Sequence, residues 1–328
     1  MKAVWYEGFG AADKVLVEGE KPDPEPASGE VLVRIAVSGV NPVDTKRRQG
    51  GRGDMPGEYV IPGFDGAGVI EAVGDGVNAS RVGQRVWVFN AQFGRNFGTT
   101  AELCAVPAEL AVPMADTVPY DAGACLGIPA LTAHRCLFAD GPLDGQIVLV
   151  TGGAGAVGNY AVQMAHICGA RVIATVSGSE KAALASAAGA EHVVNYRTED
   201  VAERIMEITG GAGVDRVVEV DFAANLATNI KILKVNGVIS SYASDSNTTP
   251  AVPFYELVYK CITVHHVVVF LMPDYARKKA VANTADWVNG GRLTHHLGPR
   301  FPLVRAADAH AAVEGGAFGK VLIDVQSL

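Results

Sequence analysis

The feature that most constrains this chain is a glycine-rich turn between an apolar run and a helical pattern. VLV (148–150) leads into Gly153-Ala154-Gly155-Ala156-Val157-Gly158, and NYAVQMAHICGA (159–170) follows. The spacing G-x-G-x-x-G suits a tight turn, the close approach of a pyrophosphate to the backbone, and close packing of helix on strand. Free N–H groups at the helix N-terminus would bind the phosphates. The sequence therefore predicts a dinucleotide site, and the alternative is a glycine-rich turn without a ligand.

Strand and helix patterns alternate around this turn. Residues 146–150 and 171–176 are apolar runs without alternation, typical of strands buried on both faces of a parallel sheet. The continued alternation predicts a doubly wound sheet, preceded by a helix over 121–138. The first third instead has short alternating strands, such as 30–40 and 66–74, which predict a small barrel or sandwich. The few elements of the tail are expected to complete this first domain.

Composition excludes several classes of protein. A chain of 328 residues suggests two domains, and the net charge of −8 argues against a broad nucleic-acid surface. Five cysteines without a CxxC pair favour reduced thiols and a cytoplasmic location. The apolar run at 267–272 stops at Pro273, so no membrane span is expected, and MKAVWYEGFG lacks the apolar region of a secretion signal.

The end of the second predicted strand bears on which dinucleotide binds. NAD sites usually place an acidic residue there, where it binds the ribose 2′-OH. Here the strand ends in Ser177-Gly178-Ser179, and Ser177 and Glu180 have capping-box spacing, followed by Lys181. Hydroxyls, a helix N-terminus and a lysine would bind a 2′-phosphate, which favours NADP(H) over NAD(H). The alternative is that Ser177 only caps the helix and Lys181 is solvated.

Six blocks stand in a fixed order along the chain. They are SGVNPVDT (38–45), PGFDGAGVIEAVGDGV (62–77), GIPALTAHRCL (127–137), VTGGAGAVG (150–158), VVNYRTED (193–200) and GAFGKVLI (316–323). Through these blocks the chain resembles the zinc-free quinone oxidoreductases, or zeta-crystallin family, of the medium-chain dehydrogenase/reductase superfamily. The resemblance covers nearly the whole chain.

The resemblance implies an α/β fold with two domains. A GroES-like β-barrel catalytic domain would comprise 1–126 and 268–328, and a doubly wound Rossmann coenzyme domain would comprise 127–267. The implied activity is hydride transfer from NADPH to a small-molecule quinone without zinc. One alternative is an NADPH-dependent 2-alkenal or enone reductase. Another is a non-catalytic NADPH-binding protein, crystallin-like or RNA-binding, and the negative net charge weakens the RNA-binding version.

The resemblance also implies a set of site residues. Asn41 and Asp44 are the catalytic candidates, Asp44 as a proton relay or polar cleft group, or merely as a cap after Pro42. Tyr196 and Lys181 would flank the 2′-phosphate. The family's cofactor contacts carry over to Asn41, Thr132, Gly155, Ala156, Val157, Gly158, Ser177, Lys181, Tyr196, Ser241, Tyr242, Phe270 and Lys320.

The chain departs from its zinc-dependent relatives at the metal ligands. Those relatives have a cysteine where this chain has Ser38 to Val40, and a histidine where it has Phe64. Their third ligand falls within 126–131, where neither Cys nor His occurs, so we expect no metal. An aromatic residue of the family is replaced by Lys46, which suggests a more polar substrate pocket.

The apolar segment around 262–270 bears on assembly. It is long and lacks proline, and we expect it to form the strand that closes one side of the parallel sheet. An exposed edge of that kind invites pairing, which predicts a homodimer across a two-fold axis. His265 and His266 on this strand would point to opposite faces, so they would not ligate one ion together.

Overall fold

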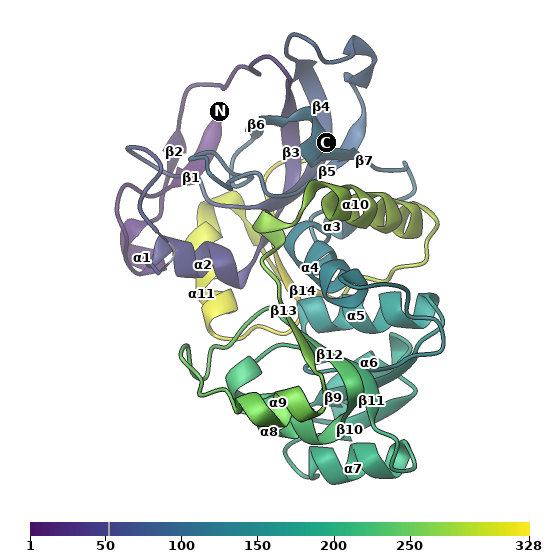
Figure 1. Cartoon of the computed structure of the whole chain (residues 1–328). Coiled ribbons are helices and arrows are strands. Elements are labelled where there is room, and N and C mark those ends of the chain that lie inside the picture. The colour runs from purple at the N-terminus through teal and green to yellow at the C-terminus, as the bar shows by residue number, and fades with distance from the viewer. Residues whose placement is uncertain (52) are drawn as a thin grey trace. The chain divides into compact units, whose positions relative to one another are not determined.

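The computed structural model describes residues 1–51 and 53–328, which form two compact units (Figure 1). The first unit contains Met1–Ile128 and Val281–Leu328, and the second contains Pro129–Ala280. The domain boundaries expected from the sequence, after residues 126 and 267, stay a prediction. Within the described residues, no helix combines the length and the apolar character needed to cross a membrane.

The first unit is built on a mixed sheet in which β3 is central. The strand order is β14-β15-β3-β4-β5-β7, and β6 also pairs with β3. The strands are β3 (Glu30–Val40), β4 (Asp65–Val73), β5 (Arg85–Val88), β6 (Leu103–Pro107), β7 (Ala111–Pro113), β14 (Leu297–Pro302) and β15 (Lys320–Asp324). Both faces of β3 are covered, so Val31, Leu32, Val33 and Ile35 are all buried, although the sequence alternates.

Short elements surround this sheet. β1 (Lys2–Trp5) and β2 (Val17–Glu20) form a separate antiparallel pair. The helices are α1 (Ala12–Val15), α2 (Pro42–Arg48), α3 (Tyr120–Gly123) and α11 (Ala306–Glu314). The tail returns as its sequence predicts, because β15 pairs antiparallel with β3 and carries β14 on its other edge.

The second unit is a parallel six-stranded sheet with the order β10-β9-β8-β11-β12-β13. Its strands are β8 (Ile147–Val150), β9 (Arg171–Val176), β10 (His192–Asn195), β11 (Val214–Glu219), β12 (Leu233–Ser241) and β13 (Thr263–His266). The order reverses between β8 and β11, which is where doubly wound sheets bind ligands at the carboxyl ends of their strands. The doubly wound fold predicted from the sequence is therefore confirmed.

Helices connect these strands. They are α5 (Ala156–Ile167), α6 (Ser179–Ala187), α7 (Val201–Ile208), α8 (Phe222–Ile232) and α9 (Phe254–Tyr259). α4 (Gly127–Phe138) and α10 (Asp274–Asn289) each contain one limit between the two units. The core of the second unit joins sheet residues such as Leu149 and Val217 to Leu226 and Ile230 of α8.

Two elements differ from expectation. The helix expected over 121–138 is interrupted between α3 and α4, where the Ile128 N–H donates to the Asp65 carboxylate at 2.9 Å and so begins a new helix. The edge strand expected over 262–270 is only β13, because the chain turns into a 3-10 segment at Val269–Leu271. β13 nevertheless closes one side of the sheet, as predicted.

Candidate active site

The glycine-rich turn between β8 and α5 leaves one position open. A Cβ at Gly158 would lie 2.2 Å from the carbonyl oxygen of Gly152, and one at Gly153 would lie 2.6 Å from Cβ of Ala174 on β9. A Cβ at Gly155 would meet only the Gly152 oxygen, at 3.3 Å. Two of the glycines are therefore required for packing. Gly155, the N-cap of α5, leaves space where a phosphate can approach the backbone.

The neighbouring strand ends gather the residues predicted to bind a 2′-phosphate. The Tyr196 N–H, just after β10, donates to the Val176 oxygen at the end of β9 at 3.1 Å. Ser177 follows Val176 directly, and Lys181 lies in the first turn of α6. Tyr196 is half exposed, so its ring is accessible to a ligand. The expectation that Ser177, Lys181 and Tyr196 share one corner agrees with this arrangement.

The helix start at this corner corrects one expectation. The N-cap of α6 is Gly178, with extended backbone at φ 172° and ψ 172° and no side-chain capping bond. The expected capping box of Ser177 and Glu180 is therefore wrong, because α6 begins one residue later than that box requires. Glu180 consequently has no capping role at this helix.

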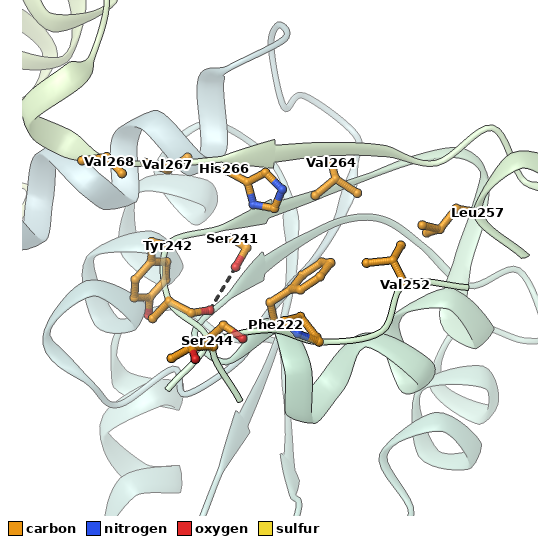
Figure 2. A pocket seen from close by; sticks show the side chains of 13 residues that line it. Phe222, Ser241, Tyr242, Ser244, Val252, Leu257, Val264, His266, Val267 and Val268 are labelled. Atoms are coloured by element: carbon orange, nitrogen blue, oxygen red, sulfur yellow. Dashed lines mark hydrogen bonds between the residues drawn. The ribbon is translucent and has the colours of Figure 1, made fainter. Parts of the chain in front are cut away.

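A pocket of about 550 Å³ lies at the carboxyl ends of β12 and β13. It contains two of the predicted cofactor residues, Ser241 and Tyr242, and Figure 2 shows the Ser241 hydroxyl donating to the Ala243 oxygen at 3.1 Å. The ring of Phe222 meets His266 edge-on at 5.8 Å. The lining residues are Phe222, Ser241, Tyr242, Ala243, Ser244, Thr248, Pro250, Val252, Leu257, Val264, His266, Val267 and Val268.

The remaining candidate in the second unit after β13, Phe270, lies in the 3-10 segment and does not line this pocket. Thr132 is buried within α4. The structure thus brings together Gly155 to Gly158 at one strand end, Ser177 with Tyr196 at the next, and Ser241 with Tyr242 at a third. It places neither Phe270 nor Thr132 among them.

The first unit contains a buried polar network that holds Asn41 and Lys320. The Lys320 ammonium donates to Oδ1 of Asn41 at 2.6 Å and to Oδ2 of Asp65 at 2.9 Å. The Asn41 amide donates to the same Asp65 oxygen at 2.8 Å. All three side chains are at least nine-tenths buried, and these bonds use two of the three ammonium protons of Lys320.

Asp44 caps the helix that follows Asn41. Its carboxylate accepts the Asn41 N–H at 2.7 Å and the Gly63 N–H at 3.2 Å, which completes a capping box at the start of α2. Burial raises the pKa of Asp44 from 3.8 to about 7, against the backbone bond from Asn41, which lowers it. The contribution of Asp44 to stability therefore falls as the pH rises through this range. The capping alternative for Asp44 agrees with the structure.

Asp65 is the network residue that sequence reasoning missed. It stands at the start of β4 and is fully buried. Besides Asn41 and Lys320, its carboxylate accepts the Ile128 N–H at 2.9 Å. The available signal was an acidic residue inside an otherwise apolar block, Phe64 to Ile70, because a buried carboxylate requires partners.

The positions that replace metal ligands have structural partners. The Ser38 hydroxyl shares a hydrogen bond with the Thr99 hydroxyl at 2.7 Å, and Phe64 is fully buried. Among residues 1–51 and 53–328, no group of three or more His, Cys, Asp or Glu side chains is placed to hold a metal ion. The absence of a metal stays a prediction.

Comparison with known proteins agrees with both units. A family model described as "Alcohol dehydrogenase GroES-like domain" matches residues 27–116, and one described as "Zinc-binding dehydrogenase" matches residues 156–286. A quinone oxidoreductase of Mus musculus is 33% identical, covering 98% of this chain and 97% of the relative. The chain belongs to the quinone oxidoreductase family of medium-chain dehydrogenases/reductases.

Two solved structures are similar over the same extent. A mycobacterial protein complexed with NADPH is 32% identical with a TM-score of 0.87, covering 99% of this chain and 100% of the other. A 2-haloacrylate reductase is 28% identical with a TM-score of 0.85, covering all of both chains. The GroES-like domain and the Rossmann domain expected for this oxidoreductase are thereby confirmed.

Substitution of two glycines tests the geometry of the turn. Gly→Ala inside a helix ordinarily stabilises by about 1 kcal/mol, but at Gly158 the methyl group meets backbone, so we expect a loss of about 1–3 kcal/mol. Gly155→Ala is the control, and its free energy of unfolding should change by less than about 1 kcal/mol. Urea denaturation measures both. Equal effects of the two substitutions would contradict the geometry.

A double-mutant cycle tests the buried ion pair. Asp65→Ala and Lys320→Met each leave a buried charge without its partner, so each should destabilise by about 3–5 kcal/mol. The double variant should lose less than the sum by about 0.5–3 kcal/mol, because neither charge is then stranded. Urea denaturation gives all four free energies. Additive losses would show that the two side chains do not interact.

Proposed function

We propose that the protein is an NADPH-dependent reductase that delivers a hydride to a quinone or an enone without a metal ion. The observation that carries this proposal is the open Gly155 position at the N-terminus of α5, at the switch point of a doubly wound sheet. A dinucleotide pyrophosphate fits a cradle that a Cβ would partly fill. Membership of the quinone oxidoreductase family supports the same conclusion.

The residues of the second unit fit NADPH in particular. The N–H groups from Gly155 to Gly158 would hold the pyrophosphate, and Ser177, Lys181 and Tyr196 would hold the 2′-phosphate. No acidic residue ends β9, so nothing at that position repels the phosphate. Ser241 and Tyr242 would contact the far half of the cofactor. When bound, NADPH supplies the hydride from its nicotinamide ring.

The network of the first unit would orient Asn41 and Lys320. Lys320 keeps one ammonium proton beyond its bonds to Asn41 and Asp65, and an anionic cofactor group is a suitable acceptor for it. Asn41 and Asp44 remain the candidates for the catalytic polar groups. Asp44 fixes the backbone of Asn41, and Asn41 in turn contacts Lys320. The chain thus supplies binding and orientation.

A quinone is the favoured acceptor, and an enone is the second candidate. The family relatives are named for quinones, whereas the 28% identical 2-haloacrylate reductase is named for reduction of an activated double bond. In both cases reduction places negative charge on a carbonyl oxygen, which then takes a proton. Both acceptors therefore need the same polar surroundings.

The proposal includes a homodimer through β13 and a cytoplasmic location. β13 is the edge strand of the sheet, so its outer backbone groups have no strand beside them within the described chain. The adjacent α9 exposes Tyr255 and Tyr259, at 67% and 80%. A second copy pairing its own β13 across a two-fold axis would extend both sheets.

A substrate panel tests the activity. Purified protein should oxidise NADPH with a panel of benzoquinones and naphthoquinones, and more slowly with 2-alkenals. Elemental analysis should find no stoichiometric zinc, and a chelator should leave the rate unchanged. Faster turnover of 2-alkenals would select the enone alternative. NADPH binding without turnover of either panel would select the non-catalytic role, and one zinc per chain would overturn the metal-free proposal.

Cofactor preference tests the phosphate site. Lys181→Ala should lower kcat/KM for NADPH about tenfold or more, because a charge-assisted bond contributes about 1.5–3 kcal/mol. NADH lacks the 2′-phosphate and should be almost unaffected. Ser177→Asp should shift preference further toward NADH. Lys231→Ala on α8 is the charge-matched control and should change neither cofactor. Equal losses for NADPH and NADH in Lys181→Ala would move the phosphate site elsewhere.

A further inference from the structure

Glu219, at the end of β11, is a fully buried carboxylate with several hydrogen-bond donors around it. Oε1 accepts bonds from the Thr151 hydroxyl at 3.1 Å, the Asp221 N–H at 2.6 Å and the Asn225 amide at 2.8 Å. Oε2 accepts the Asn229 amide at 2.6 Å. Burial raises the pKa of Glu219, and these bonds lower it. The chain thus places a costly group here and surrounds it with donors.

On one side this carboxylate fixes the entry to the glycine-rich turn. Thr151 directly precedes Gly152, and its hydroxyl accepts the Val220 N–H at 2.9 Å. The Thr151 N–H donates to the Val218 oxygen at 3.0 Å. The last residue before the turn is therefore held to the end of β11 through both its backbone and its side chain.

On the other side Glu219 fixes the walls of the pocket. It is the register partner of Ser241, and its backbone oxygen accepts the Tyr242 N–H at 3.2 Å. Asn225 lies one turn into α8, the helix that begins with Phe222, and the Phe222 N–H donates to the Ala243 oxygen at 3.0 Å. Figure 2 shows Phe222, Ser241 and Tyr242 around one pocket. The same carboxylate therefore anchors the helix and borders the strand end that line it.

We infer that Glu219 is a positioning residue that holds the glycine-rich turn and the pocket of Ser241 and Tyr242 at one fixed spacing, so that the two halves of a single dinucleotide bind together. This inference rests on the proposed function, because it takes the turn as the pyrophosphate site and the pocket as the site for the nicotinamide half. Glu219 acts through Thr151 and α8, and its side-chain contacts are with protein groups. A ligand that reaches only the 2′-phosphate corner has no need of this spacing.

The test compares two ligands of different reach. NADPH spans both sites, whereas adenosine 2′,5′-bisphosphate occupies only the corner of Ser177, Lys181 and Tyr196. Glu219→Ala should raise the Kd for NADPH at least tenfold and change the Kd for the bisphosphate less than twofold. Calorimetry gives both constants. A merely structural role would weaken the two ligands alike, and that outcome would overturn the inference, as would wild-type affinity for NADPH.

Conservative variants keep the test decisive. Glu219→Gln should bind NADPH within about threefold of wild type, since Oδ1 of Asn229 is buried without a described partner and can accept from glutamine once the asparagine amide turns over. If Glu219→Ala does not fold, Thr151→Val removes one bond to the carboxylate at nearly constant volume. It should show the same selective loss, at least threefold for NADPH. Equal binding of both ligands to Thr151→Val and wild type would overturn the inference.

Asp215→Asn provides the matched control at the opposite end of β11. Its carboxylate pairs with Lys234 at 2.8 Å and accepts the Ile147 N–H, away from the carboxyl ends of the strands. Its affinity for NADPH should equal that of wild type, and a loss as large as that of Glu219→Ala would overturn the inference. Wild-type protein that binds neither NADPH nor the bisphosphate would instead contradict the proposed function, so the two failures are distinguishable.

Discussion

The pairing of Lys320 with Asp65 organises the first unit. Removing an ammonium and a carboxylate from water is costly, and the cost is offset only when both groups are paired and their remaining hydrogen-bonding positions are used. Here the carboxylate also accepts bonds from Asn41 and from the backbone of Ile128. Four chain positions that are far apart in sequence therefore meet at one carboxylate. They include the start of α2, the start of α4 and the last strand.

In the second unit the corresponding constraint is the parallel sheet itself. Parallel strands deliver all their carboxyl ends to one edge, so the glycine-rich turn, the Ser177 corner and the Ser241 pocket lie on that edge although long segments separate them in sequence. The buried Glu219 at the end of β11 ties two of these three places together. A dinucleotide is long enough to need several such places at once, and the sheet presents them in a row.

Much of the fold could be predicted because its signals are local. The apolar run and the glycine spacing predict β8, the turn and α5 directly, and β3 matches its predicted limits, Glu30 to Val40. The failures lie at boundaries that distant residues decide. The interruption before α4 depends on Asp65, and the start of α6 depends on the extended backbone of Gly178. Neither partner is visible to a reading of neighbouring residues.

The sequence alone determined which residues bear the chemistry: glycines where a side chain would block the turn, serine and lysine where an acid would repel a phosphate, and Ser38 and Phe64 where zinc-dependent relatives have ligands. Only the tertiary structure decided how Asn41, Asp65 and Lys320 meet, and that Glu219 borders both the turn and the pocket. The physical reason is that burial and hydrogen-bond partnership are properties of the packed chain. A carboxylate in a sequence carries no mark of whether water or four donors will surround it.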